Sequence, residues 1–166
     1  ICGVLMEIIS LINQKGGVGK TISSINIAAG LAMFFNKKVL LVDIDPQSSA
    51  TLSFGIRKES VKFSSYDVIV GNCDIKDSII KTSITNLDIC PANKNLVGLN
   101  LELVSEMSRE DKLKDSLDSI KCLYDFIIID CPPSLDLITL NAMVASDSCL
   151  IPLQLDLFSA DGFNEL

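Results

Sequence analysis

The feature that most constrains the fold is a series of short, almost continuous apolar runs. Such runs are typical of parallel strands covered on both faces. The predicted strands are residues 7–13, 39–43, 87–90, 126–130 and 149–152. The stretches between them have apolar residues at helical spacing. The predicted helices are residues 20–35, 65–70, 75–80, 95–107, 110–123 and 136–145.

Strand alternating with helix predicts an α/β fold, with a doubly wound, mostly parallel sheet flanked by helices. Residues 1–166 read as one domain, because the sequence contains no internal repeat and no low-complexity linker. The pattern at residues 160–165 predicts the start of a further helix. We therefore expect the C-terminal part of the domain to lie beyond Leu166.

The composition limits the possible partners and compartments. With 14 basic and 21 acidic residues, the net charge of −7 argues against a surface that binds nucleic acid everywhere, so any DNA contact must be local. The first 13 residues lack the basic start of a signal peptide, and no segment reaches the roughly 20 apolar residues of a membrane span. The predicted location is the cytoplasm, with no membrane contact.

The cysteines do not indicate a metal site or a disulfide framework. The chain has six cysteines but no Cys-x-x-Cys pair and no histidine to complete a zinc site. We expect them to be reduced thiols that are mostly buried.

A glycine-rich loop lies between the first predicted strand and the first predicted helix. Residues 15–21 read Lys-Gly-Gly-Val-Gly-Lys-Thr, which is the context and spacing of a phosphate-binding loop. We expect Lys20 to neutralise the β- and γ-phosphate oxygens and Thr21 to ligate Mg²⁺. A glycine-rich turn without a ligand is the disfavoured alternative. The expected nucleotide-binding residues are Gly16, Gly17, Val18, Gly19, Lys20, Thr21 and Ile22.

The loop carries a second lysine, Lys15, and Gln14 occupies the position where a phosphate loop usually begins with glycine. A long cation at the mouth of the loop can reach a nucleotide held by a facing copy, as an arginine finger does. Lys15 is therefore a candidate catalytic residue that acts across a dimer. The alternative is a solvated surface lysine.

Three aspartates follow predicted strands, where ligands sit in α/β sheets. Asp130 closes an apolar run as a Walker B aspartate does, and we expect it to hold Mg²⁺ through water. We assign Asp45 to the attacking water and Asp43 to the outer metal shell. The alternatives are a helix-capping role for Asp130 and a purely structural turn before Pro46.

These motifs together resemble the ParA/MinD family of deviant-Walker ATPases, from Glu7 to Leu166. Residues 15–21 resemble its signature loop, residues 41–47 its second motif and residues 128–134 its Walker B motif. Within the family, three sets of residues in this chain are most similar to the Soj-type partition branch. These sets are residues 45–47 with 50–51, residues 86–88 with 91–92, and residues 151–154.

The resemblance implies slow, Mg²⁺-dependent ATP hydrolysis in a sandwich homodimer, with Lys15 reaching across it and Asp45 activating water. It also implies non-specific DNA binding by the ATP-bound, nucleoid-associated dimer, and a ParB-type partner that stimulates hydrolysis during plasmid or chromosome segregation. The segments for adenine and DNA would lie beyond Leu166. Ile22 and the Ser48-Ser49 pair depart from the family pattern, and Ile22 removes a hydroxyl that could meet the α-phosphate.

Three other functions remain open. A MinD-type positioning ATPase shares the loop but anchors to membranes through a C-terminal amphipathic helix, and the residues after Asp45 favour partition. Iron-protein relatives hold a cluster with interface cysteines, for which Cys131 is the only candidate here. A nucleotide-gated scaffold with negligible turnover is consistent with Ile22, whereas Asp45 argues for hydrolysis.

Overall fold

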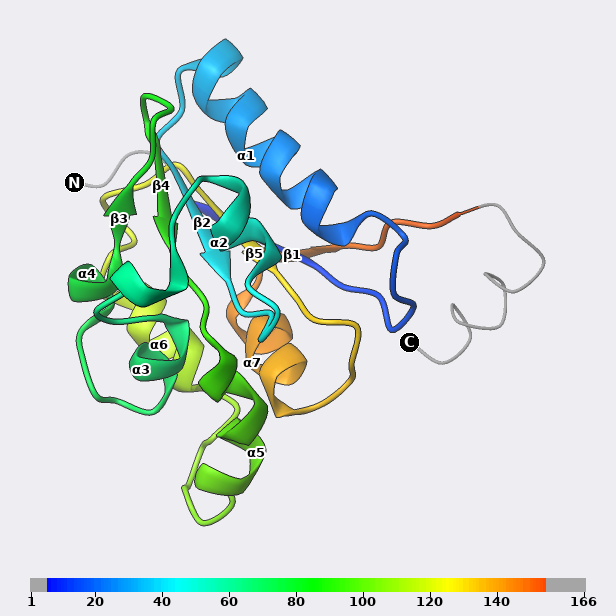
Figure 1. Cartoon of the computed structure of the whole chain (residues 1–166), viewed down its shortest axis with the longest axis vertical. Helices are drawn as coiled ribbons and strands as arrows, with labels where there is room; N and C mark the ends of the chain where they lie inside the picture. The colour runs from blue at the N-terminus through cyan, green and yellow to red at the C-terminus, as the bar shows by residue number, and fades with distance from the viewer. Residues whose placement is uncertain (1–5, 155–166) are drawn as a thin grey trace.

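A computed structural model describes residues 6–154, which contain a six-stranded sheet in the order β3-β4-β2-β5-β1-β6 (Figure 1). The strands are β1 (Glu7–Leu11), β2 (Val39–Asp43), β3 (Ile80–Lys81), β4 (Leu87–Cys90), β5 (Phe126–Asp130) and β6 (Ser148–Leu150). Neighbouring strands are parallel, except that β3 pairs antiparallel with β4. This confirms the predicted mostly parallel sheet.

Helices cover both faces of the sheet. The α-helices are α1 (Lys20–Phe35), α2 (Ser49–Ser53), α3 (Ser65–Ile69), α4 (Ile75–Ser78), α5 (Leu99–Glu102), α6 (Lys112–Asp118) and α7 (Leu137–Ala145). Two 3-10 helices, η1 (Lys58–Ser60) and η2 (Lys94–Gly98), lie in the connections. Figure 1 shows α1 on one side of the sheet and α3, α6 and α7 on the other. The doubly wound arrangement is therefore confirmed.

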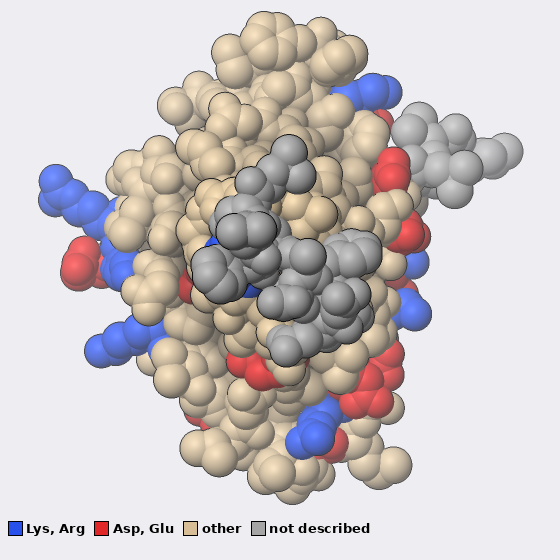
Figure 2. All heavy atoms as spheres, turned by 90° about the vertical axis from the view of Figure 1, so that its right-hand side faces the viewer, with Lys and Arg blue, Asp and Glu red and all other residues tan. Residues whose placement is uncertain are grey.

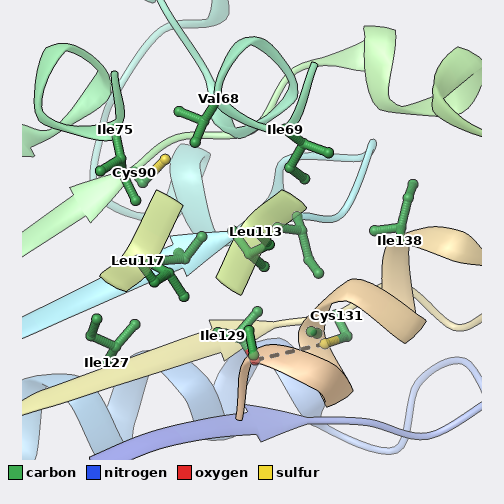
Figure 3. Close-up of a cluster of buried hydrophobic side chains, with 14 of the residues drawn as sticks. Val68, Ile69, Ile75, Cys90, Leu113, Leu117, Ile127, Ile129, Cys131 and Ile138 are labelled. Carbon is green, nitrogen blue, oxygen red and sulfur yellow. Dashed lines mark hydrogen bonds between the residues drawn. The ribbon is translucent and has the colours of Figure 1, made fainter. Parts of the chain in front are cut away.

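Two apolar cores result, one on each face, because successive residues of a strand point to opposite faces. Leu40 and Val42 of β2 belong to the larger core, whereas Val39 and Leu41 pack against α1 in the smaller one. The larger core combines residues of α3, α4, α6, α7, β4 and β5 (Figure 3). This burial on both faces explains why the strands are nearly continuous apolar runs in the sequence.

The strand register brings the carboxyl ends of the central strands together. Asp130, the last residue of β5, lies opposite Leu11 of β1 on one side and Asp43 of β2 on the other. The segments that leave these strands therefore start from one edge of the sheet. These segments carry the glycine-rich loop and the predicted acidic residues.

Several predicted elements differ from the structure. Residues 95–107 form η2 and the short α5 followed by turns, and the predicted helix at 110–123 is reduced to α6. The predicted helix at 75–80 ends at Ser78, because Ile80 begins β3. The first strand ends at Leu11 and the last comprises Ser148–Leu150. Neither α2 nor β3 was predicted, and the expected helix near 160–165 lies outside the described residues.

The expectation of mostly buried cysteines is wrong for the described part of the chain. Cys90 and Cys131 are buried, but Cys73 is half-buried and Cys122 and Cys149 are exposed. All five are free thiols, as expected. Cys2 lies outside the described residues.

Candidate functional site

The glycine-rich loop joins β1 to α1 at the carboxyl edge of the sheet. Gly17 and Gly19 have φ values of 76° and 94°, a backbone region that residues other than glycine rarely adopt. Among residues 6–154, no atom would lie within 4 Å of a Cβ atom at Gly16 or Gly17, so packing in this part of the chain does not exclude side chains there. These glycines leave open space at the start of α1.

The N-terminus of α1 is itself a candidate binding feature. Gly19 occupies the N-cap position, without a side-chain cap, and the first turn contains no acidic residue. No anionic side chain of the helix itself therefore interacts with its first N–H groups or with the positive end of its dipole. Such an end is suited to an anion such as a phosphate.

Neighbouring side chains anchor the loop. Asn13 is buried, its Nδ2 donates to the Pro152 carbonyl at 2.9 Å, and its Oδ1 accepts from the Lys15 N–H at 2.9 Å. Gln154 Nε2 donates to the Gly17 carbonyl at 3.1 Å. The segment after β6 therefore fixes the loop from the side. Sequence reasoning gave no role in the loop to Asn13 or Gln154.

Lys20 is the first residue of α1 and is 7% exposed. Its Nζ donates to the carbonyls of Asn13 at 2.8 Å and Lys15 at 3.2 Å. Burial lowers the pKa of this amine, while the nearby Asp130 and Asp45 carboxyls act in the opposite direction. The loop thus holds the Lys20 amine near two of the three aspartates that the sequence singled out, Asp130 and Asp45.

Asp130 lies behind the loop and is fully buried. Ser24 Oγ, one turn into α1, lies 2.8 Å from Asp130 Oδ1 and donates to it. Burial raises the pKa of Asp130 to about 6, and the Ser24 and Thr21 side chains oppose this rise. Asp130 Oδ2 has no hydrogen-bond partner within residues 6–154. An unsatisfied buried carboxylate oxygen beside Thr21 fits a magnesium ion or its bound water.

Asp43 is fully buried at the end of β2. Its Oδ1 accepts the Asp45 N–H at 3.0 Å, and its Oδ2 accepts the Thr51 N–H at 2.8 Å and the Thr51 hydroxyl at 2.7 Å. Burial raises the pKa of Asp43 to about 7 despite these bonds. Asp45 Oδ1 accepts the Gln47 N–H at 2.8 Å.

These elements enclose a cleft of about 250 Å³ at the loop. Its lining residues are Gly16, Gly17, Gly19, Lys20, Thr21, Ile22, Asp45 and Pro133. Most of the predicted nucleotide-binding residues therefore meet in one cleft together with Asp45. Val18 is buried, and neither it nor Lys15, Asp43 or Asp130 belongs to the lining. Larger hollows lie elsewhere, such as one of about 510 Å³ beside Met6 and Asp147, but they contain no glycine loop.

Other site types find little support in the part of the chain that the structure describes. Residues 6–154 contain no group of three or more His, Cys, Asp or Glu residues that could hold a metal ion. Cys131 packs in the larger core, and its Sγ lies 3.9 Å from the Ile129 carbonyl (Figure 3). A buried thiol of this kind is poorly placed to ligate a cluster at a subunit surface. Within the same range, no helix has the length and apolar character needed to cross a membrane.

Comparison with known proteins relates this site to a family. A protein-family model described as an AAA domain matches residues 6–166. The sporulation initiation inhibitor protein Soj of Bacillus subtilis is 50% identical over 160 residues, which is 96% of this chain and 63% of that protein. The chain thus spans somewhat less than two thirds of the length of this relative.

Two crystal structures share the fold. A cobyrinic acid a,c-diamide synthase from Mycobacterium smegmatis, with bound ADP and magnesium, has a TM-score of 0.92 and 34% identity over 96% of this chain and 64% of that one. A putative plasmid partition protein from Borrelia burgdorferi, bound to AMPPNP, has a TM-score of 0.85 and 32% identity over 96% of this chain and 66% of that one. The chain belongs to the AAA-domain family and is a homologue of the Soj and ParA partition proteins.

Proposed function

We propose that this chain binds ATP with Mg²⁺ and hydrolyses it slowly as a partition ATPase. The observation that carries the proposal is the cleft at the start of α1, where Lys20, Thr21 and Asp45 meet in front of the buried Asp130. The nucleotides bound in the two related crystal structures, and the magnesium in the first of them, support it. The similarity to Soj favours partition over other activities of the same fold.

The polar residues and the glycines of the cleft have roles that follow from their chemistry. Lys20 and the N–H groups of α1 bind the β- and γ-phosphate oxygens, and the glycines leave room for the phosphates to approach the backbone. Thr21, with Asp130 through water, would hold the magnesium ion, which neutralises phosphate charge and orients the phosphates. Asp45 orients the attacking water.

ATP binding would close a homodimer in which Lys15 of each copy reaches the nucleotide of the other. The ATP-bound dimer would bind DNA without sequence preference, and a ParB-type partner would stimulate hydrolysis and release. Figure 2 shows acidic and basic side chains around the edge of one face and mainly uncharged residues elsewhere on its described surface. This distribution, with the net charge of −7, favours a DNA contact that is local rather than spread over the surface.

The test is ATP turnover of the complete gene product, with and without non-specific duplex DNA and with and without anionic lipid vesicles. Stimulation by DNA alone supports partition. Stimulation by lipid alone would move the assignment to a MinD-type positioning ATPase. Tight ATP binding without turnover would favour a nucleotide-gated scaffold.

Site variants sharpen this test. Lys20→Ala should abolish nucleotide binding, whereas Lys121→Ala, which removes an exposed lysine paired with Asp118, should not. Asp45→Ala should retain ATP binding and accumulate the ATP-bound dimer, and normal turnover in this variant would refute its role. Lys15→Ala should spare binding by the monomer but prevent the productive dimer.

A further inference from the structure

The turn that carries Asp45 is held at both ends by one buried carboxylate. Asp43 Oδ1 accepts the N–H of Asp45 at 3.0 Å, at the start of the turn. Asp43 Oδ2 accepts the N–H and the hydroxyl of Thr51, in α2 at the far end of the turn, at 2.8 Å and 2.7 Å. Asp43 and Thr51 have no exposed surface.

The Thr51 hydroxyl also receives a hydrogen bond. Its Oγ1 accepts the N–H of Ala92 at 3.0 Å, and Ala92 belongs to the segment that follows β4. The hydroxyl proton therefore points to Asp43 while a lone pair points to Ala92. Ser65 Oγ fixes Asp43 from a third side, by donating to its main-chain carbonyl at 2.7 Å. This network ties β2, α2, α3 and the end of β4 together.

Within the turn, the position of the Asp45 side chain depends on the backbone. Asp45 Oδ1 accepts the Gln47 N–H at 2.8 Å, and the Asp45 carbonyl accepts the Ser48 N–H at 2.8 Å. Ser48 itself has a φ of 60°, an uncommon value for serine. These bonds fix the direction of the Asp45 carboxylate only while the two ends of the turn stay in place.

We propose that Thr51, through Asp43, is a positioning residue that sets the place of Asp45 at the cleft. The inference rests on the proposed function, because it assigns a role in hydrolysis. It also gives Asp43 a role different from the outer metal shell predicted from the sequence. Within residues 6–154, the three hydrogen bonds that the Asp43 carboxylate accepts come from the Asp45 turn and α2. In the same range Asp130 Oδ2 has no partner, and Thr21 interacts with the Asp130 carboxyl group.

The decisive variant is Thr51→Val, which keeps the shape of the side chain and removes the hydroxyl. We expect kcat for ATP to fall about 10- to 100-fold, because a small displacement of a reacting group has effects of this size. The Kd for ATP, measured with a fluorescent analogue, should stay within about threefold, since Thr51 does not line the cleft. Thr51→Ser, which restores the hydroxyl, should recover most of the turnover.

The matched control is Thr82→Val. The Thr82 hydroxyl also donates and accepts, to the Leu87 carbonyl at 2.7 Å and from the Ile84 N–H at 3.1 Å, but it lies beyond the end of β3 and does not line the cleft. Thr82→Val should therefore leave both kcat and Kd unchanged. Should Thr51→Val fail to fold, Ser65→Ala loosens the same network at Asp43 and should lower kcat less, again without changing Kd.

Amide hydrogen exchange of the nucleotide-free protein gives a second reading that does not need turnover. Thr51→Val should accelerate exchange at Asp45, Gln47 and Ala92, and Thr82→Val should not. Unchanged kcat and exchange in a folded Thr51→Val would overturn the inference, as would a Thr51→Ser variant no better than Thr51→Val. Absence of turnover in the wild-type protein would instead refute the proposed function, and the exchange rates would still decide whether Thr51 holds the turn.

Discussion

Replacing Ser24 with alanine tests how the buried Asp130 is held. Ser24 is fully buried, and its hydroxyl lies 2.8 Å from Asp130 Oδ1 and 3.0 Å from the Lys20 carbonyl. Ser24→Ala removes the hydroxyl that donates to Oδ1. The other oxygen, Asp130 Oδ2, has no partner in the described residues and so does not compensate for the loss. The pKa of Asp130, already raised to about 6 by burial, should rise further.

The loss of unfolding free energy caused by Ser24→Ala should be larger at high pH than at low pH. The folded pKa of Asp130 lies above its unfolded value, so ionisation of this group destabilises the fold as pH rises. Ser24→Ala should lower the free energy of unfolding by about 1.5–3 kcal/mol at pH 8, where a hydrogen bond to a charged group is lost. At pH 5 the carboxyl is largely protonated, and the loss should be about 0.5–1.5 kcal/mol.

Urea denaturation of the nucleotide-free protein at the two pH values measures this difference. The control is Ser116→Ala in α6, because the Ser116 hydroxyl makes the same type of helical bond, to the Lys112 carbonyl at 2.9 Å, without a carboxylate partner. Its effect should be the same at pH 5 and pH 8. If Ser24→Ala also destabilises the protein equally at both pH values, the hydroxyl does not stabilise the Asp130 charge, and the reasoning fails.

Three further predictions concern the same site. Ile22→Thr should tighten ATP binding about 2- to 10-fold in a nucleotide titration, because Ile22 is 62% exposed at the cleft and a hydroxyl there gains a phosphate contact; an unchanged Kd would show that the hydroxyl finds no partner. Gln154→Ala should weaken binding by a similar factor, since the Gly17 carbonyl loses its donor, and an unaltered affinity would contradict the anchoring role. For the wild-type chain, burial raises the pKa of Asp43 to about 7 and of Asp130 to about 6. The free energy of unfolding should therefore fall by up to roughly 4 kcal/mol from pH 5 to pH 8. Denaturation curves that show a rise in this free energy would exclude the two raised pKa values.

The sequence predicted the parts of the fold that are strongly patterned. The bounds of α1, β2, β4 and β5 agree with the structure, because a long helix and strands buried on both faces leave unmistakable patterns. It failed for β3, which has two residues, and for residues 95–107. There Val97, Leu101, Val104 and Met107 remain exposed, so their helical spacing does not correspond to one buried helical face.

For the site, the sequence predicted the residues whose chemistry is tied to a local motif. Lys20, Thr21 and Asp45 meet at the cleft, and their roles remain predictions. Sequence reasoning did not single out Ser24 and used Thr51 only for the family resemblance, because Asp130, the partner of Ser24, and Ala92, a partner of Thr51, are distant in the chain. Ser24 lies one helical turn after Lys20, on the side of α1 that faces the sheet, and that spacing was the one available signal.

The uncapped start of α1 has a wider consequence. In a helix that carries its own N-terminal cap, a side chain satisfies N–H groups of the first turn, so that turn does not depend on a ligand. Here position 19 is a glycine with no capping side chain, so a bound phosphate would complete the helix as well as occupy the site. The ligand is then a structural component of the element that binds it, and thermodynamic linkage makes the order of this first turn depend on ligand concentration. A sensor can use such a helix end to convert nucleotide supply directly into local rigidity.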